Sequence, residues 1–459
     1  MSPDASSNRP SSPLLGPTVE LLQQLIRNEC VNDGTPESGN EVRNADLLEA
    51  YLGGGGLDVE RYESLPGRGS LVARIEGSDP SAPSLCLMGH TDVVPVNADS
   101  WSHDPFGGER IRNADGDEEI WGRGAIDMLN LTSSMAVAFR HLAETGFRPR
   151  GTLIYFGVAD EEAGGTWGAE WMFEHHPEAI AADYVLTELG GWSAVGGDGT
   201  RRITINVGEK GLAWRRLRVR GTPGHGSMPF GADNALVTAA EVVRRLAAYR
   251  PAPHLDEIWR GQVASMGLPD DVEAALLDPA RVLSTIEQMP TPIARTCHAA
   301  THTTISPNVA HGGQKTNTIP DVIDLDVDIR TVPGTSEADV AALLADALGD
   351  LADRVEVSVL QQYDPTISPI GNPLWDTLAA HTQVAYPGSQ LIPGIVTGGT
   401  DARFYRSRGS VAYGAGLFTP QMDFATFGQR FHGNDERVDV ASLDLAVELW
   451  VGVARDLLD

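Results

Sequence analysis

Short apolar runs that end in histidine or carboxylate residues constrain this chain more than any other feature. Each run has the length and composition of a buried strand, and its polar residues follow at the carboxyl end. The runs with their polar successors are Leu85–Met88 with His90 and Asp92, Thr152–Ala159 with Glu161 and Glu162, and Tyr184–Leu186 with Glu188. A further acidic residue, Asp127, closes the stretch Gly122–Asp127. Open α/β sheets bind their ligands at the carboxyl ends of strands, so these residues are expected to meet there.

Helical segments separate these runs, which favours an α/β sheet of parallel type with both faces covered by helices. The spacing of apolar residues predicts a first helix over Val19–Ile26, a second over Asn44–Leu52 and a long one over Leu129–Glu144. Near the carboxyl terminus, Leu374–Ala385 and Val440–Leu457 are predicted to be helices that pack on the same sheet.

The pattern changes after Glu209-Lys210-Gly211. The segment Ile323–Arg330 alternates strictly between apolar and charged residues, which is typical of an antiparallel sheet with one open face. Helices predicted over Ala232–Tyr249 and Glu337–Leu348 complete an inserted α+β domain, and Pro251–Pro292 adds helical material. The predicted division is a disordered leader at 1–17, a catalytic domain in two parts at 18–210 and 365–459, and the inserted domain at 211–364.

Composition narrows the functional class. The 459 residues include 34 basic and 63 acidic ones, a net charge of −29 that repels phosphate backbones, so nucleic-acid binding is not expected. No apolar run approaches the roughly 18 residues of a membrane span. The three cysteines show no Cys-x-x-Cys spacing, and the amino terminus lacks the features of a signal peptide. We therefore expect a cytoplasmic enzyme without membrane association.

The candidate metal ligands are oxygen and nitrogen donors: His90, Asp127, Glu162, Glu188 and His432. Such donors suit zinc and could also accept cobalt or manganese. Five are too many for one tetrahedral ion, but they suit two ions if one carboxylate bridges them. Two cations lower the pKa of a shared water towards ~7 and so supply hydroxide at neutral pH. Glu161, beside Glu162, could act as the base, and Asp92 is placed to orient His90.

The combination of motifs resembles the co-catalytic zinc amidohydrolases and exopeptidases, which include acetylornithine deacetylase, succinyl-diaminopimelate desuccinylase, aminoacylase and glutamate carboxypeptidase. The resemblance runs from about Leu21 to the carboxyl terminus. The matching stretches are His90–Pro95, Trp101 with Pro105-Phe106, Gly122–Asp127, Asp160–Glu162, Gly398–Arg403 and His432-Gly433. It implies a zinc-exopeptidase-like mixed sheet sandwiched by helices, with an inserted α+β lid that often also forms a dimer.

The resemblance also implies a role for each site residue. Asp127 would bridge two zinc ions, His90 and Glu188 would complete one site, and Glu162 and His432 the other. Glu161 would be the general base and Asp92 would orient His90. His225 would stabilise the oxyanion, often from the partner subunit. Substrate contacts would come from Asn317, Arg330, Gly399 and Thr400. Leu129 and Asn130 replace the lysine and glycine usual in the family, but neither position is a ligand.

The expected function is hydrolysis of an amide or peptide bond in an N-acyl amino acid or small peptide with a free carboxylate, in the manner of a carboxypeptidase, dipeptidase or aminoacylase. A succinyl-diaminopimelate desuccinylase or related biosynthetic deacylase is one alternative, and a non-catalytic binding protein on the same fold is another. For single residues, simpler interpretations stay open. His225 could be a turn residue, and Arg330 could merely offset repulsion among the aspartates on its own face of the strand.

Overall fold

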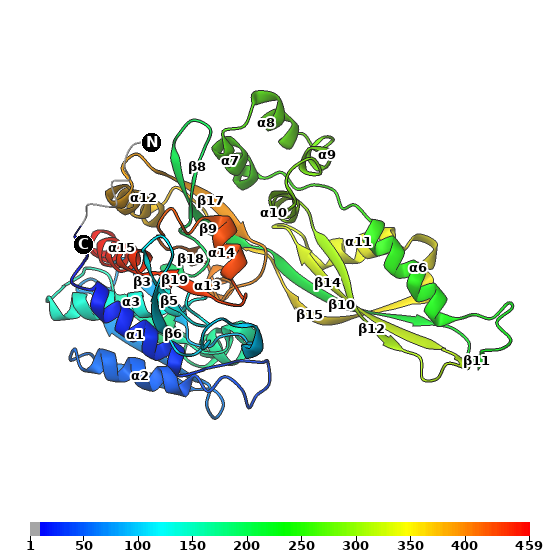
Figure 1. Ribbon diagram of the computed structural model, residues 1–459, viewed down its shortest axis with the longest axis horizontal. Helices are drawn as coiled ribbons and strands as arrows, with labels where there is room; N and C mark the ends of the chain where they lie inside the picture. The colour runs from blue at the N-terminus through cyan, green and yellow to red at the C-terminus, as the bar shows by residue number, and fades with distance from the viewer. Residues whose placement is uncertain (1–9) are drawn as a thin grey trace.

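The computed structural model describes residues 10–459 and consists of two bodies joined at their edges (Figure 1). The larger body holds a ten-stranded mixed sheet in the order β1-β2-β6-β3-β7-β18-β9-β16, with β8 and β17 also paired to β9. The smaller body extends to one side and holds a four-stranded antiparallel sheet in the order β12-β14-β10-β15. We call the smaller body, from β10 to β15, the lid.

Along the central strands, successive apolar side chains point to opposite faces of the large sheet, so both faces are covered. On β3 (Leu85–His90), Leu85 and Leu87 pack into one hydrophobic cluster, whereas Cys86 and Met88 pack into another. The same split occurs along β6 (Leu153–Val158), which runs parallel to β3. The first cluster also holds α1 (Leu15–Arg27), α2 (Val42–Gly53), α3 (Leu129–Glu144), α12 (Pro373–Ala385) and α15 (Val440–Leu458). The second holds α4 (Trp171–His175), α5 (Pro177–Ile180) and α13 (Ala402–Arg406).

The predicted layered α/β fold with an inserted domain is confirmed, and the sheet is mixed. The strands β6, β3, β7 (Tyr184–Thr187) and β18 (Val411–Gly414) are parallel, and antiparallel strands flank them. The antiparallel neighbours are β1 (Val59–Glu63), β2 (Gly69–Ile75), β8 (Ser193–Val195), β9 (Arg201–Glu209) and β16 (Thr366–Ile367). β17 (Gln390–Val396) joins β9 in parallel.

The predicted disordered leader extends too far. Residues 1–9 of that leader lie outside the described residues, but α1 already begins at Leu15 rather than at Val19. Pro17 is tolerated because the first four N–H groups of a helix have no partner within the helix. Leu14 and Leu15 pack against the main core, and the Thr18 N–H donates to the Leu14 carbonyl at 3.1 Å. This apolar contact explains why the helix starts earlier than its internal periodicity indicates.

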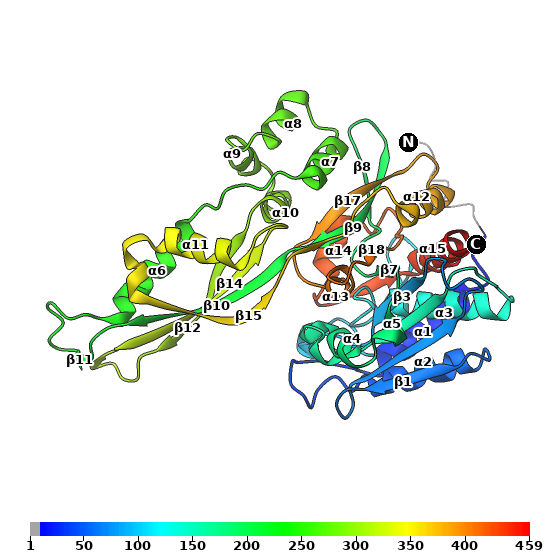
Figure 2. The same cartoon turned by 180° about the vertical axis from the view of Figure 1, so that it is seen from behind.

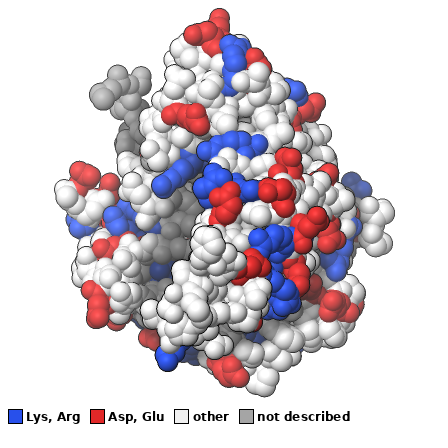
Figure 3. Space-filling view, turned by 90° about the vertical axis from the view of Figure 1, so that its right-hand side faces the viewer, with Lys and Arg blue, Asp and Glu red and all other residues white. Residues whose placement is uncertain are grey.

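The lid has the open-faced sheet that the alternating segment predicted. Along β14 (Val322–Thr331) every second residue is buried, and the aspartates lie on the outer face. There Asp324 and Asp326 pair with Arg218 and Arg216 of β10 (Gly211–Arg220), with nitrogen–oxygen distances of 2.8 and 2.7 Å. The other strands are β12 (Thr304–Gly312) and β15 (Val355–Tyr363), and the inner face carries α6 (Ala235–Ala248) and α11 (Glu337–Leu348). Figure 3 views the molecule from the lid end and shows basic and acidic side chains interspersed.

Four short helices between α6 and β12 confirm the extra helical material predicted at Pro251–Pro292, although the last one continues to Thr301. They are α7 (Glu257–Met266), α8 (Asp270–Leu276), α9 (Val282–Ile286) and α10 (Thr291–Thr301), and they share a small core of their own. Seen from behind, α7 lies against β17 of the large sheet (Figure 2). The predicted domain limits stay a prediction; they fall between β9 and β10 and between β15 and β16. Within residues 10–459, no helix is long and apolar enough to cross a membrane.

Candidate metal centre

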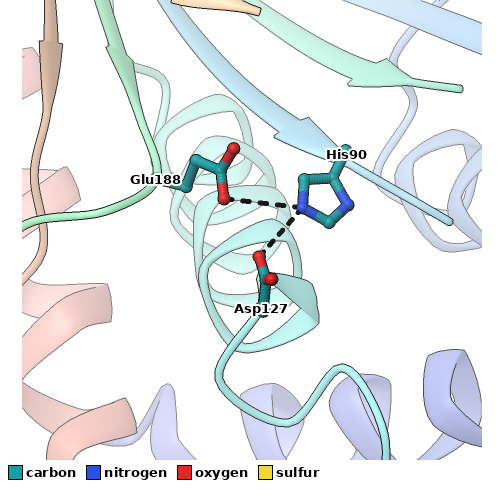
Figure 4. Close-up of side chains that lie close together, drawn as sticks. All are labelled: His90, Asp127 and Glu188. Carbon is teal, nitrogen blue, oxygen red and sulfur yellow. Dashed lines mark hydrogen bonds and ion pairs between the residues drawn. The ribbon is translucent and has the colours of Figure 1, made fainter. Parts of the chain in front are cut away.

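The first group of metal-ligand side chains comes from three different elements. His90 is the last residue of β3, Glu188 follows β7, and Asp127 lies just before α3 (Figure 4). The His90 Nε2 atom lies 3.2 Å from Asp127 Oδ1 and 3.6 Å from Glu188 Oε2. All three residues are buried. Unlike the other acids, Asp127 does not follow a strand of the large sheet. The strand before it, β5 (Glu118–Trp121), belongs to a separate three-stranded sheet with β4 (Glu109–Arg112) and β19 (Arg437–Asp439).

The second group shares Asp127 with the first. His432, just after α14 (Phe424–Arg430), has its Nε2 atom 2.8 Å from Asp127 Oδ2 and 3.3 Å from Glu162 Oε2. Its ring stacks on Phe431 with centroids 4.2 Å apart, which limits its rotation. The two oxygens of Asp127 therefore face two different histidines. In residues 10–459 these are the two groups of three or more such side chains whose ligand atoms lie within 4.8 Å of one another.

The charges of this cluster fit divalent cations. Burial, with repulsion from Asp127, raises the pKa of Glu162 to about 7 and that of Glu188 to about 8. Burial would lower the pKa of His432, but its bonds to Asp127 and Glu162 raise it to about 10. Glu162 Oε1 is buried and has no hydrogen-bond partner among the described residues. Buried carboxylates that repel one another cost free energy to ionise together, and one of their oxygens lacks a hydrogen-bond partner. Zinc or a similar cation would offset the repulsion and would take that oxygen as a ligand.

His90 is held in the tautomer that a metal ligand needs. Its Nδ1 atom lies 2.9 Å from the main-chain carbonyl of Asp92, which can only accept, so Nδ1 carries the proton. The lone pair is then on Nε2, which faces Asp127 and Glu188. The sequence suggested the Asp92 carboxylate for this role, but its Oδ1 atom is farther from Nδ1, at 3.6 Å. The second oxygen, Oδ2, instead accepts hydrogen bonds from Asn32 Nδ2 and the Glu162 N–H.

Glu161 lies beside both groups. Burial, followed by repulsion from Glu188, raises the pKa of its carboxyl group well above the usual value, and His90 opposes this rise. A carboxylate in such surroundings is a stronger base than one in water. The turn that carries it is unusual, because Asp160 has a left-handed backbone conformation with φ of 69°. A non-glycine residue in that region costs free energy, and such strain is concentrated at functional sites.

A buried ion pair that sequence analysis missed supports Asp127. Glu436 accepts hydrogen bonds from the N–H groups of Ile126, at 2.9 Å, and Asp127, at 3.2 Å. Its other oxygen pairs with Arg123. The exposed fractions of the Arg123 and Glu436 side chains are 3% and 0%. Glu436 is one of several acids in a polar stretch, so the sequence does not distinguish it from its neighbours; only its proximity to Arg123 in space does.

The predicted lid residues are not near the metal-ligand groups of the same chain. His225 is exposed on β11 (Gly224–His225), which lies at the far end of the lid (Figure 1). Asn317 is next to it, because the Gly226 N–H donates to the Asn317 carbonyl at 2.8 Å and β11 pairs with β13 (Thr318–Ile319). The structure thus brings His225 and Asn317 together but keeps both away from His90 and His432.

The remaining predicted substrate contacts lie nearer the junction of the two bodies. Arg330 pairs with Asp328 of its own strand at 2.8 Å and covers the ring of Trp214. Thr400 is buried, and its N–H and hydroxyl groups both donate to Glu209 Oε2, at 2.7 and 2.8 Å. Its polar groups therefore fix the Gly399-Thr400 loop to the end of β9. Gly399 itself is exposed, so the loop leaves main-chain atoms free on its outer side.

The sequence profile of Peptidase family M20/M25/M40 matches residues 86–456. The chain belongs to this family. Aminoacylase-1 of Homo sapiens is 28% identical over 448 residues, covering 95% of this chain and 93% of that protein. The N-fatty-acyl-amino acid synthase/hydrolase PM20D1 of Xenopus tropicalis is 28% identical over 412 residues, covering 86% of this chain and 76% of that protein.

Solved structures agree on the fold. The M20 family metallo-carboxypeptidase Sso-CP2 from Sulfolobus solfataricus superposes with a TM-score of 0.71 at 18% identity, covering 97% of this chain and 99% of that one. Human carnosine dipeptidase 1 gives 0.66 at 17% identity, covering 97% of each. The chain is therefore a hydrolase of a metal-dependent family whose members act on peptides or acyl amino acids. The predicted family and fold class are confirmed.

The Arg123–Glu436 pair gives a test of how the Asp127 loop is held. Replacing Glu436 with Gln keeps an acceptor for the two N–H groups but leaves a buried guanidinium without its counter-charge. Burial raises the pKa of Glu436 to about 7, so the comparison belongs at a pH of about 8.5, where Glu436 is ionised. We expect urea unfolding of the metal-free protein to show a loss of about 3–5 kcal/mol.

The matched control is Glu118→Gln, which removes a carboxylate from the exposed pair with Arg110. Exposed ion pairs contribute little, so its unfolding midpoint should stay close to that of the unchanged protein. Equal small losses in the two variants would show that the buried pair does not hold this loop.

Proposed function

We propose that this protein is a two-metal amide hydrolase that cleaves an N-acyl amino acid or a small peptide with a free carboxylate. The observation that carries the proposal is the shared carboxylate of Asp127, which faces His90 with one oxygen and His432 with the other. Two cation sites joined by one carboxylate, about 3.5–4 Å apart, are typical of metal-dependent amide and ester hydrolases. A single structural ion would not need this arrangement.

The proposed ligands divide into two sets around Asp127. His90 and Glu188 would hold one cation, and Glu162 and His432 the other. Zinc suits these donors, and cobalt or manganese could replace it. When bound, such ions lower the pKa of water and polarise a carbonyl group. The protein contributes the fixed Nε2 lone pair of His90, and it buries the His90 group, whereas His432 in the second group is exposed.

Glu161 is the proposed general base. It follows the left-handed turn at Asp160 and is beside, rather than within, the two ligand groups. In this position it would take a proton from the attacking water and give it to the nitrogen of the leaving amine. Its raised pKa suits both steps, because a base must hold the proton long enough to return it.

His225 and Asn317 would stabilise the oxyanion of the tetrahedral intermediate as hydrogen-bond donors. Both lie at the far end of the lid, so we propose that they act on the metal centre of a second copy in a homodimer. Exposed apolar side chains in this part of the lid support a protein contact there: Met228, Phe230, Leu236 and Val237.

The proposed substrate carries a carboxylate near the scissile bond. Arg330 and the outer side of the Gly399-Thr400 loop, at the junction of the two bodies, are the proposed contacts for it. The relatives named for aminoacylase and for acyl-amino-acid hydrolysis favour N-acyl amino acids over a biosynthetic deacylase. The presence of all five ligands and of Glu161 argues against a non-catalytic binding protein. The cytoplasm remains the expected location.

Hydrolysis of a mixed panel by zinc-reloaded protein tests the proposed function. The panel contains N-acetyl and long-chain N-acyl amino acids, free dipeptides, N-blocked dipeptides and N-succinyl-diaminopimelate. We expect zinc-dependent cleavage with the N-acyl amino acids preferred. Preference for dipeptides would replace the acylase assignment by a peptidase one. No cleavage of any member would favour the binding-protein alternative.

Replacing Glu161 with Gln tests the base assignment. The amide keeps the shape of the side chain but cannot accept the water proton, so turnover should fall by about 10²–10⁴-fold. Metal content, measured by inductively coupled plasma mass spectrometry, should not change. The neighbouring Glu162→Gln variant is the control and should lose metal instead. A Glu161→Gln enzyme with normal turnover would remove Glu161 from the mechanism.

Mixing two inactive variants tests whether His225 acts across a dimer. His225→Ala should lower kcat by about 10²–10³-fold, as loss of one oxyanion donor does elsewhere. In a mixed dimer with Glu161→Gln subunits, one centre combines an intact Glu161 with an intact His225 from the other chain. Co-refolded mixtures should therefore recover activity that neither parent has. A mixture that stays inactive, although heterodimers form, would place His225 in the same chain.

A further inference from the structure

Asn32 lies outside every motif identified in the sequence, yet its side chain contacts the loops that carry the candidate metal ligands. It is buried with 3% of its surface exposed, in the segment between α1 and α2. Main-chain contacts fix the segment against the loop after β3. The Asn32 N–H donates to the Val93 carbonyl at 2.9 Å, and the Val93 N–H donates to the Cys30 carbonyl at 3.0 Å. The position of Asn32 relative to His90 is thus set by backbone pairing.

The two ends of the Asn32 amide face opposite kinds of partner. Its Nδ2 group donates to Asp92 Oδ2 at 2.9 Å and to Asp160 Oδ1 at 3.2 Å. Its Oδ1 atom accepts from Arg68 Nη2 at 3.1 Å and from the Gly34 N–H at 3.0 Å. This network determines the amide orientation, because neither carboxylate could face the oxygen favourably. Only an amide can donate to two acids on one side and accept from a guanidinium on the other.

The two carboxylates belong to the two loops that carry the proposed chemistry. Asp92 follows His90 at the end of β3, and Asp160 precedes Glu161 at the end of the neighbouring strand β6. Both acids are buried, with exposed fractions of 0% and 1%. Two buried carboxylates repel one another unless donors lie between them. The Nδ2 group of Asn32 is such a donor and holds the two loops at a fixed separation.

Arg68 anchors the far side of this arrangement. Its Nη1 atom pairs with Glu41 and lies 3.5 Å from Asp160 Oδ1, and its Nη2 atom also donates to the Thr35 carbonyl at 2.8 Å. Arg68 and Glu41 are both buried. Glu41 Oε1 in turn accepts from the Asp160 N–H at 3.2 Å. The position of the Asn32 amide is therefore fixed by a buried ion pair and not by contacts with water.

We propose that Asn32 is a positioning residue of the hydrolytic centre, which sets the distance between the His90 loop and the turn that carries Glu161 and Glu162. The inference rests on the proposed function. Asn32 does not touch the reacting atoms and acts through Asp92 and Asp160. Asp92 Oδ2 passes this constraint on, since it also accepts from the Glu162 N–H at 3.1 Å. Side chains that support metal ligands in this way change metal affinity or activity by about 10–100-fold when replaced.

The Asn32→Leu variant removes the amide at nearly constant volume and without adding charge. We expect zinc affinity, measured by competition with a chelator, to fall about 10–100-fold. We expect kcat to fall in the same range while KM changes little, because the substrate contacts are elsewhere. The visible spectrum of the cobalt-loaded protein should also change, since it reports the geometry around the ions. All measurements are made at a temperature where circular dichroism shows the variant to be folded.

Asn44→Leu is the matched control. Asn44 is also a buried asparagine, and its Nδ2 group donates to the Thr91 carbonyl of the same loop at 2.7 Å, but it contacts neither carboxylate. The Asn44→Leu replacement should lower the midpoint of thermal unfolding and leave zinc affinity, the cobalt spectrum and kcat unchanged. Equal effects of the two replacements on these properties would mean that Asn32 is merely structural and would overturn the proposal.

Asn32→Asp covers the case in which Asn32→Leu does not fold. It keeps the shape of the side chain and an acceptor for Arg68, but loses both donated hydrogen bonds, so kcat should still fall at least tenfold. A normal kcat would overturn the proposal. Failure of the proposed function would appear as absence of hydrolysis in the unchanged protein. In that case the zinc affinities of the Asn32→Leu and Asn44→Leu variants would still differ if Asn32 positions the metal ligands.

Discussion

The carboxylate of Asp127, with one oxygen directed at each of two histidines, is the interaction on which the rest of this structure depends. It lies close to Glu162 and Glu188 in one region, where burial and repulsion from Asp127 raise the pKa of both. No arginine or lysine pairs with these three carboxylates in the described part of the chain. Divalent cations would neutralise the negative charge of such a cluster. The strands of the large sheet hold the acids close together.

The large sheet brings these residues together because adjacent parallel strands end side by side. His90 and the Glu161–Glu162 turn follow β3 and β6, and Glu188 follows β7, on the other side of β3. Loops at strand ends are intrinsically mobile, so each is fixed by a buried polar contact from a distant part of the chain. Glu436 fixes the Asp127 loop, Glu209 fixes Thr400, and Asn32 holds the loops after β3 and β6. Asn32 comes from the first segment of the large body and Glu436 from its last, whereas Glu209 is the end of β9.

Periodicity predicted the elements whose faces are strongly contrasted. The helices Leu129–Glu144 and Glu337–Leu348 were placed to the residue, and β14 was recognised from its alternation. The strand β9 was missed although Ile203, Ile205 and Val207 alternate with polar residues, because its ends are charged and leave only this short alternation. Three of the candidate ligands could be found because they follow strands, whereas Asp127 and His432 do not follow strands and were found only from the motifs around them. Asn32 and Glu436 could not, because a single polar residue has no pattern and its role depends on which segments fold against it. The distance of His225 from the centre depends on the arrangement of whole domains, which no local pattern encodes.

Calorimetric titration of the metal-stripped protein with zinc, compared with the same titration of the Asp127→Ala variant, tests the shared carboxylate most directly. The account predicts two zinc ions per chain in the unchanged protein. It predicts that Asp127→Ala weakens both sites together, since one side chain serves both. An Asp127→Ala variant that loses one site and keeps the other at unchanged affinity would contradict the account, as would a single ion in the unchanged protein.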